Sequence, residues 1–324
     1  MEPFLSIFQT FIFPGFLFFI GLAFFFEWLD RKFYADMQSR VGPLYTGPRG
    51  ILQPIADFIK LMIKEDLTPK YADKKIFNSV PVIMCALMLT AITLMPVMGN
   101  AGIISFSGDI VLAITAMTFF CILVFLAGFS SVSRYSAIGA ERAVLQLLGF
   151  EIPLMLSIVG VCIASGSVEI AGIVSWQGSN LWNIAGPQLL GFIIFLVAAQ
   201  AELERIPFDI PEAEQEIVAG WVTEYSGRKL AIIRLSRNLE LVFISALAVA
   251  LYLGGPYGPL VAGAEAFLLP LYFVLKMFLV LAVLVTVRAV FARVRIDQMV
   301  SFAWRYLIPL SLLQILITVL WRAL

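Results

Sequence analysis

Histidine is absent from the chain, and cysteine occurs only three times in 324 residues. Cys85, Cys121 and Cys162 stand singly in separate apolar stretches, as small core residues commonly do. Without histidine or paired cysteines, the chain lacks the usual side-chain ligands of zinc, haem and iron–sulfur clusters. A glycine-rich nucleotide-binding motif is missing too. We therefore expect this chain to bind no metal. If the protein belongs to a redox enzyme, the redox centres would have to lie in other subunits.

Charged residues are also scarce, at 14% of the chain, whereas 61% are hydrophobic and the mean hydropathy is +0.96. This composition is typical of integral membrane proteins. Eight continuous apolar stretches are long enough, or nearly so, for the roughly 20 residues of a membrane-crossing helix: residues 8–28, 78–98, 109–130, 144–164, 183–201, 239–254, 266–290 and 306–322. Because these runs do not alternate as barrel strands do, we predict an all-α, polytopic membrane bundle of eight transmembrane helices. We expect one integral membrane domain over residues 1–324, with the first helix retained, since no signal-peptide cleavage pattern follows it.

Lysine and arginine are unevenly distributed between these stretches. Nine lie in the first connection, residues 31–75, and three other connections hold nearly all the rest: residues 131–143, 203–238 and 288–305. The alternate connections contain none: residues 99–108, 165–182 and 255–265. Because basic loops stay in the cytoplasm, we predict a multi-pass protein of the cell membrane with the four basic connections cytoplasmic and both termini outside.

The first basic connection contains an amphipathic segment, residues 50–66. Apolar residues recur there at helical spacing from Ile51 to Ile63, with Asp57 and Lys60 among them. The segment is too short and too polar to span, so we predict a helix that lies on the membrane surface or packs under the bundle. Two roles are open for it: a surface anchor, or the wall of an opening.

Acidic residues concentrate in residues 201–227, AELERIPFDIPEAEQEIVAGWVTEYSG, which hold seven of the 22 carboxylates and the single base Arg205. Pro211 suits the first position of a short helix, with Glu212 and Glu216 on one face of its first turns. Interleaved apolar residues predict that this helix is half-buried. Carboxylates crowded in such a place raise one another's pKa, so the cluster would hold protons near neutral pH and titrate as a unit.

Two ionisable residues stand out within the spanning stretches. Glu151 lies about seven residues, or roughly 10 Å, into the fourth stretch, and Lys276 lies near the middle of the seventh. Such groups cost at least a few kcal/mol when unpaired, so they usually pair or line a polar path. For Lys276, a structural pair with a carboxylate on a neighbouring helix is the competing interpretation.

Four motifs carry a resemblance to one protein family. The acidic stretch resembles the signature of the membrane subunit of respiratory complex I (NADH-quinone oxidoreductase) that lies under the peripheral arm. The matching residues are Ala201, Glu202, Arg205, Pro207, Phe208, Asp209, Glu212, Glu214, Glu216, Val218, Gly220, Glu224 and Tyr225. Three further stretches are similar to that family: DRKFYADMQSRVGPLYTGPRGILQPIADFIKLMIKED, SRYSAIGAERAVLQLLGFE and VRAVFARVRIDQMVSFAWRYLIPL. The resemblance covers nearly the whole chain and extends to relatives in membrane-bound hydrogenases and sulfur-reducing complexes.

The resemblance implies a subunit of an oxidoreductase that drives proton or sodium movement. Its bundle would have eight spanning helices, and its basic connections would floor a cavity for quinone next to an iron–sulfur cluster of a neighbouring subunit. The implied partners are soluble iron–sulfur and catalytic subunits on the cytoplasmic side and antiporter-like membrane subunits in one hetero-oligomeric complex. This chain is expected to bind no cofactor of its own, although its cavity would admit quinone, and the iron–sulfur clusters would lie in partner subunits. No nucleic acid is expected.

The resemblance and the charge pattern together nominate the site residues. We expect the proton or ion relay to include Glu141, Glu151, Glu202, Asp209, Glu212, Glu214, Glu216, Glu224 and Lys276. The cavity and the interface with the peripheral arm would be formed by Asp30, Arg31, Arg40, Gln53, Asp57, Arg205, Phe208, Arg288, Arg293, Arg295 and Asp297. In this scheme Lys276 is the cationic partner of a deep carboxylate, and the basic residues dock the soluble arm.

Some positions depart from the family pattern. Gly149 and Phe150 replace hydroxyl residues, Asp30 replaces a glutamate, and Glu141 replaces an apolar residue. These changes leave open the same role in a ferredoxin-fed hydrogenase or sulfane sulfur reductase that uses no quinone. A stand-alone ion transporter and a structural anchor are the remaining alternatives, although the paired broken helices of alternating-access transporters are missing from the pattern.

Overall fold

The computed structural model describes residues 8–259 and 263–323, and within these ranges the regular secondary structure is helical, without strands. The long helices are α2 (Phe16–Met37), α4 (Lys74–Ile92), α5 (Asp109–Ser130), α6 (Arg134–Ser165), α8 (Leu189–Glu202), α10 (Gly227–Tyr252), α11 (Glu265–Val290) and α13 (Ile308–Ala323). Shorter elements connect them: η1 (Pro48–Gly50), α3 (Gln53–Ile63), α7 (Ile170–Ser179), η2 (Asn183–Ala185), α9 (Glu214–Ile217), η3 (Gly220–Val222), α12 (Ile296–Phe302) and η4 (Ala303–Leu307). The predicted all-α class is confirmed, and the predicted amphipathic segment contains helix α3.

Helices occupy all eight of the predicted spanning stretches. Six helical segments are long and apolar enough to cross a membrane: Phe8–Met37, Lys74–Ile92, Asp109–Ser130, Arg134–Ser165, Glu265–Val290 and Ile296–Ala323. The other two stretches correspond to α8, which is apolar but has only 14 residues, and to α10, which has 26 residues and carries several charges. The chain is therefore a polytopic helical membrane bundle.

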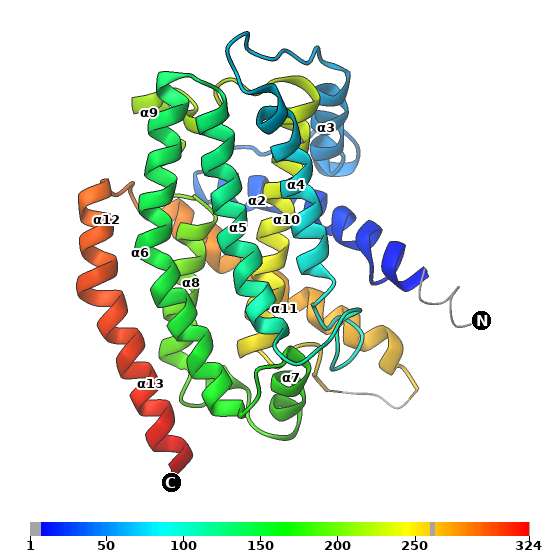
Figure 1. Ribbon diagram of the computed structural model, residues 1–324. Coiled ribbons are helices and arrows are strands. Elements are labelled where there is room, and N and C mark those ends of the chain that lie inside the picture. The colour runs from blue at the N-terminus through cyan, green and yellow to red at the C-terminus, as the bar shows by residue number, and fades with distance from the viewer. Residues whose placement is uncertain (1–7, 260–262, 324) are drawn as a thin grey trace.

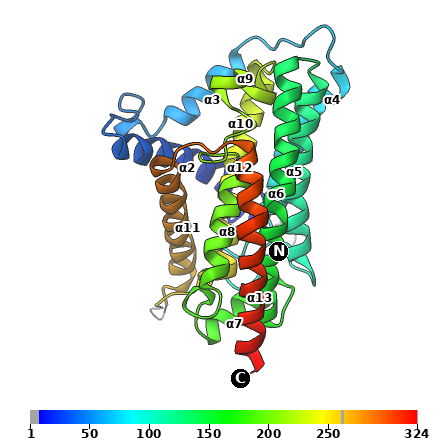
Figure 2. The same cartoon turned by 90° about the vertical axis from the view of Figure 1, so that its left-hand side faces the viewer.

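Helix α10 forms the centre of the bundle. Every side chain from Leu239 to Tyr252 is buried, and the helix packs against α2, α4 and α11. Figures 1 and 2 show it enclosed by its neighbours. The surrounding helices bury one stripe and expose apolar side chains on the other, such as Phe119, Leu148 and Leu279. Such surfaces suit contact with lipid or with other membrane subunits.

Two helices begin earlier than hydropathy predicts. Helix α6 begins at Arg134 instead of residue 144, and α10 begins at Gly227 instead of residue 239. Helical hydrogen bonding continues through their charged first turns, because the charges there are exposed or paired. With 32 residues, α6 is about 48 Å long and exceeds the roughly 30 Å hydrocarbon core. Glu151 therefore lies in the middle of α6, and its predicted place near the start of the helix is wrong.

The four basic connections gather at one end of the bundle, which we call the basic end (residues 31–75, 131–143, 203–238 and 288–305). The Asp73 N–H donates to the Ser130 carbonyl at 3.0 Å, and the Val294 N–H donates to the Pro207 carbonyl at 3.1 Å. In Figure 1 helices α3 and α9 lie at this upper end, and α7 lies at the opposite end.

The alternate connections meet at the other end, which we call the far end (residues 99–108, 165–182 and the described part of 255–265). The Asn100 side chain donates to Ser175 at 2.7 Å and accepts from the Tyr257 hydroxyl. Ser105 donates to Glu169 at 2.9 Å. The alternation of basic and non-basic connections along the sequence thus corresponds to two separate ends in space.

Candidate functional site: a charged cavity at the basic end

The acidic stretch folds as a series of turns between α8 and α10. Helix α9 begins at Glu214 and not at Pro211 as predicted, so Glu212 lies in the turn before it. The chain then doubles back at Gly220, where φ is +55° and a Cβ would lie 1.9 Å from the Pro211 carbonyl oxygen. Only glycine fits this turn. Because Glu212 lies before α9 and Glu216 lies within it, the two acids do not share a helix face, and they contact different partners.

Arginines from distant segments surround these acids. Glu216 pairs with Arg142 of α6 at 2.5 Å, and Asp209 pairs with Arg293 at 3.1 Å. The hydrogen bond from Arg142 holds the pKa of Glu216 below its usual range. Burial raises the pKa of Asp209, although Arg293 acts in the opposite direction. The predicted rise in pKa is therefore wrong for Glu216, which Arg142 neutralises from outside the stretch, whereas Asp209 shows the predicted direction.

Asp30 of α2 is the centre of a second group. Its side chain is 8% exposed and accepts from Arg205 at 2.9 Å and from Arg288 at 2.7 Å. One carboxylate thereby joins α2, the acidic stretch and the last turn of α11. Burial lowers the pKa of Arg205, and the neighbouring Asp30 opposes that shift. A buried carboxylate that forms ion pairs with two arginines fixes the relative positions of the segments that it connects.

Arg237 of α10 is shared by two acids. It pairs with Glu212 at 2.5 Å and with Glu204, and its guanidinium lies 5.1 Å from the Trp221 ring centroid. The Trp221 indole N–H also donates to Glu204 at 3.2 Å. Burial raises the pKa of Glu204 to about 7, even though Arg237 favours its ionised form. This buried carboxyl can therefore gain or lose a proton near neutral pH.

These side chains line a cavity of about 710 Å³ at the basic end. Of the residues that line it, only Leu203 and Ile206 are apolar. The volume is within the roughly 300–1,000 Å³ of typical ligand sites, but such sites are mostly apolar. Among the described residues no group of three or more His, Cys, Asp or Glu could hold a metal ion. The cavity suits water, protons and polar headgroups better than an apolar ligand.

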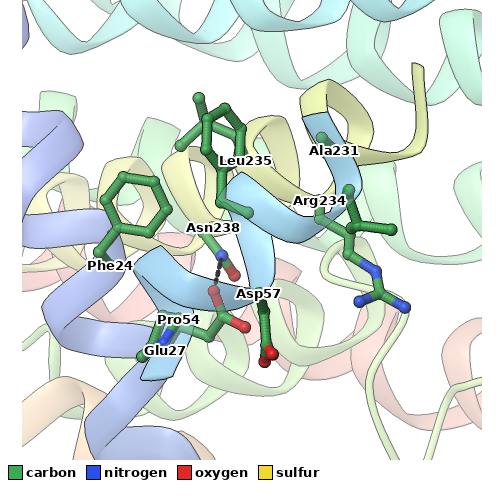
Figure 3. Close-up of a pocket in the computed structure, with 10 residues that line it drawn as sticks. Phe24, Glu27, Pro54, Asp57, Ala231, Arg234, Leu235 and Asn238 are labelled. Carbon is green, nitrogen blue, oxygen red and sulfur yellow. Dashed lines mark hydrogen bonds between the residues drawn. The ribbon is translucent and has the colours of Figure 1, made fainter. Parts of the chain in front are cut away.

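Helix α3 forms an outer wall beside this cavity. Arg31 pairs with Glu27 on α2 and with Asp57 of α3 at 2.6 Å. Burial alone would raise the pKa of Asp57, but hydrogen bonds from Arg31 and Gln53 lower it. Figure 3 shows the Asn238 amide, which donates to Glu27 at 2.6 Å, in a gap of about 10 Å³ between α2, α3 and α10. The gap shares Glu27 and Asn238 with the large cavity, whereas α3 itself lines only the small gap, so both roles predicted for this helix stay open.

A series of carboxylates continues from the cavity into the bundle. Glu204 lines the cavity, and Glu240, Glu202 and Glu151 follow, each within electrostatic range of the next. Glu240 is 3% exposed, and Glu151 accepts a hydrogen bond from Thr118 of α5. Helices α10 and α6 thus each contribute one acid to this series, and the end of α8 and the turn after it contribute Glu202 and Glu204.

Other predicted site residues lie outside these groups. The exposed ones are Arg40, Glu141, Arg295 and Asp297, and Glu224 is half-buried. Glu214 is exposed too, but it lines the cavity. Phe208 is buried, with its ring centroid 4.8 Å from that of Phe150 on α6. Phe150, which departs from the family pattern, therefore packs the acidic stretch against the bundle.

Lys276 belongs to the far end. Its ammonium donates to the carbonyl oxygens of Leu253, Gly255 and Tyr257 at 2.6–2.9 Å and lies 4.1 Å from the Trp182 ring centroid. Leu253 follows Glu240 by 13 positions, which is about 20 Å along a helix. The predicted pairing of Lys276 with a carboxylate is wrong within the described residues, because the carbonyls that follow α10 take its hydrogen bonds instead.

Sequence reasoning missed Glu27, Arg237 and Glu240 and left Glu204 out of the relay. Glu240 lies inside the predicted stretch 239–254 but was not counted among its charges. Its signal was Arg237 three residues earlier, since residues at this spacing share a helix face and buried charges come in pairs.

Comparison with known proteins decides the family. The NADH dehydrogenase family model matches residues 10–319. The chain belongs to this family. It is 41% identical to the H subunit of NADH-quinone oxidoreductase from Dehalococcoides mccartyi over 295 residues, or 90% of this chain and 80% of the relative. It is 38% identical to a counterpart of the same name in Koribacter versatilis, over 92% and 91% of the two chains, and 37% identical to one in Brevibacillus brevis, over 93% and 88%. The resemblance found in the sequence motifs is confirmed.

Proposed function

We propose that this member of the NADH dehydrogenase family is a core membrane subunit of a complex-I-type oxidoreductase. It would join the electron-transfer arm, docked on the basic end, to the ion-translocating membrane arm. The observation that supports this role is the charged cavity whose acids continue into the bundle through Glu240, Glu202 and Glu151. Relatives of this chain are named as subunits of NADH-quinone oxidoreductase.

The basic end would face the cytoplasm and the soluble subunits. Most of the basic residues expected to dock that arm are engaged within the chain: Arg205 and Arg288 hold Asp30, and Arg293 holds Asp209. Arg40 and Arg295 are exposed and remain our candidates for direct contact. The internal pairs would instead give the cavity a fixed shape for the arm to cover.

Coupling would begin at Glu204. Negative charge that arrives at the cavity raises the pKa of nearby carboxyls, and Glu204 is already poised near neutrality. At separations of about 4–8 Å and an effective dielectric constant near 20, neighbouring charges interact by roughly 2–4 kcal/mol. Protonation of one acid therefore shifts the pKa of the next acid in the series Glu204, Glu240, Glu202 and Glu151. Glu212 would be linked to Glu204 through Arg237, because a change in the charge of Glu204 alters how strongly Arg237 holds Glu212.

Quinone fits part of this cavity. Its carbonyl oxygens accept hydrogen bonds, and arginine donors line the cavity, whereas an isoprenoid tail would find only Leu203 and Ile206. We propose that only a polar headgroup enters and that the rest of the ligand lies against other subunits or lipid. The nearly complete lack of apolar lining favours a second candidate, the same role in a ferredoxin-fed complex without quinone. Neighbouring genes for a large subunit with or without nickel-binding cysteines would distinguish the two.

Neutralising Glu151 tests the relay. In Glu151→Gln we expect the complex to assemble and transfer electrons, while ion translocation in proteoliposomes falls to a small fraction of the wild-type value. Glu141→Gln is the matched control, because Glu141 is exposed on the same helix and outside the path. Full translocation by an assembled Glu151→Gln complex would leave the acids with a scaffolding role only.

A further inference from the structure

Helix α3 has two apolar faces. One, with Pro54 and Leu61, is buried and faces the gap between α2 and α10 shown in Figure 3. The other carries Ile55, Ile59 and Ile63, which are 38%, 51% and 81% exposed. Residues four apart lie on one side of a helix, so these three form a continuous stripe. A helix that met only water on this side would carry polar residues there.

Three cations flank this isoleucine stripe. Lys60 and Lys64 are exposed and follow Ile59 and Ile63 directly in sequence. Arg228, from the first turn of α10, reaches the end of α3, where its Nε donates to the Met62 carbonyl at 3.4 Å.

None of these three cations has a carboxylate within ion-pair distance among the described residues. Asp66 is taken by Lys229 at 3.1 Å, and the exposed Glu65 offsets only one of the three positive charges. The end of α3 is therefore a net cationic surface directly beside exposed hydrocarbon.

We propose that this face of α3 binds an anionic phospholipid. The isoleucine stripe contacts the acyl chains at the edge of the bilayer, and Lys60, Lys64 and Arg228 contact the headgroup phosphate. A phospholipid places negative charge directly beside hydrocarbon, which is the complement of this surface. Lysine stems reach along apolar surface while their ammonium groups stay at the polar boundary.

The site would also affect the cavity, because Asp57 on the opposite face of α3 pairs with Arg31, which lines the cavity. A bound lipid would hold α3 against α2 and α10. The proposal requires only that the chain spans a membrane, so it stands or falls separately from the redox role.

Photolabelling of the assembled complex tests the site. The complex is placed in phosphatidylcholine nanodiscs that contain a trace of photoactivatable phosphatidylglycerol or, separately, of photoactivatable phosphatidylcholine. Mass spectrometry then measures the label on residues 50–70. We expect phosphatidylglycerol to label this segment preferentially, and the combined change K60Q, K64Q and R228Q to reduce that label about tenfold or more. Labelling by phosphatidylcholine should be unchanged.

A matched control removes three other exposed cations of the same connection, with K70Q, K74Q and K75Q, and should leave the label intact. Excess inorganic phosphate should not displace the lipid, since the isoleucine stripe contributes to binding. Equal labelling by the two lipids, or equal loss in both triple variants, would overturn the proposal. So would a benzophenone at position 59 that crosslinks to another subunit and not to lipid in the native complex.

Discussion

Each end of the bundle contains buried charge, but the partners of that charge differ. At the far end the Lys276 ammonium is held by three backbone carbonyls, none of which can titrate. At the basic end Arg237 is shared by Glu212 and by Glu204, whose pKa burial raises to about 7. Buried charge alone therefore does not identify a coupling site. In the function that we propose, the titratable character of the partner separates a structural cap at the far end from the coupling network at the basic end.

The largest expected difference between the two ends is their accessibility. In sealed cells or spheroplasts, a membrane-impermeant thiol reagent should label Leu181→Cys at the far end and not Tyr45→Cys at the basic end. Both positions are well exposed in this chain, at 71% and 97%, and the same reagent applied to opened membranes shows whether the docked arm covers Tyr45→Cys. Labelling of Tyr45→Cys from outside would reverse the proposed orientation.

Removal of the shared base should be the most damaging single change at the basic end. Arg237→Met leaves Glu204 and Glu212 in a partly buried site without their cation, and we expect a loss of about 3–5 kcal/mol in stability. Thermal unfolding of the detergent-solubilised complex measures this loss. Arg234→Met, on the same helix but exposed and without an ion pair among the described residues, should stay within about 0.5 kcal/mol. Similar losses in both variants would contradict the importance of the pairing.

The basic end should also respond to pH through Glu204. Its pKa is raised from 4.5 to about 7 in the folded protein, so between these values the unfolded chain is ionised while the folded one keeps its proton. Stability from this group is therefore present at low pH and is lost as pH rises through 7, by about 3 kcal/mol at most. Glu204→Gln should remove this part of the pH dependence of thermal unfolding. An unchanged pH profile would show that Glu204 does not titrate in this range.

The far end should show a smaller loss of stability and no loss of function. Lys276→Met leaves three carbonyl oxygens without their donor, and we expect a destabilisation of about 1–3 kcal/mol. Electron transfer by the assembled complex should stay close to wild type. If electron transfer fell while stability did not change, Lys276 would have a role that its contacts do not explain.

Hydropathy and charge distribution in the sequence were sufficient to predict the bundle. They placed a helix in every spanning stretch, predicted the amphipathic helix α3 and separated the two sets of connections. They underestimated the length of α10, because its first turns contain Arg228, Arg234 and Arg237. These charges end an apolar stretch in the sequence, but helical hydrogen bonding continues through them.

The arrangement of the site could be predicted only in part. The motifs identified most of its acids, but the bases that neutralise them come from far away in sequence. Arg288 reaches Asp30 across 258 positions, and Arg142 reaches Glu216 across 74. A local reading of residues 201–227 therefore finds one base, Arg205, where the fold brings together several. Long-range pairing of this kind depends on how the helices pack, which a single sequence does not reveal.

Ion translocation per electron transferred, compared between Glu202→Gln and Lys276→Met, tests the contrast between the two ends most directly. Glu202 lies between Glu151 and Glu204 on the acid path, whereas Lys276 lies at the far end. In proteoliposomes with matched rates of electron transfer, we expect Glu202→Gln to lose most of the translocation and Lys276→Met to keep the wild-type ratio. Equal ratios in the two variants, whether both normal or both reduced, would contradict the assignment of coupling to the basic end.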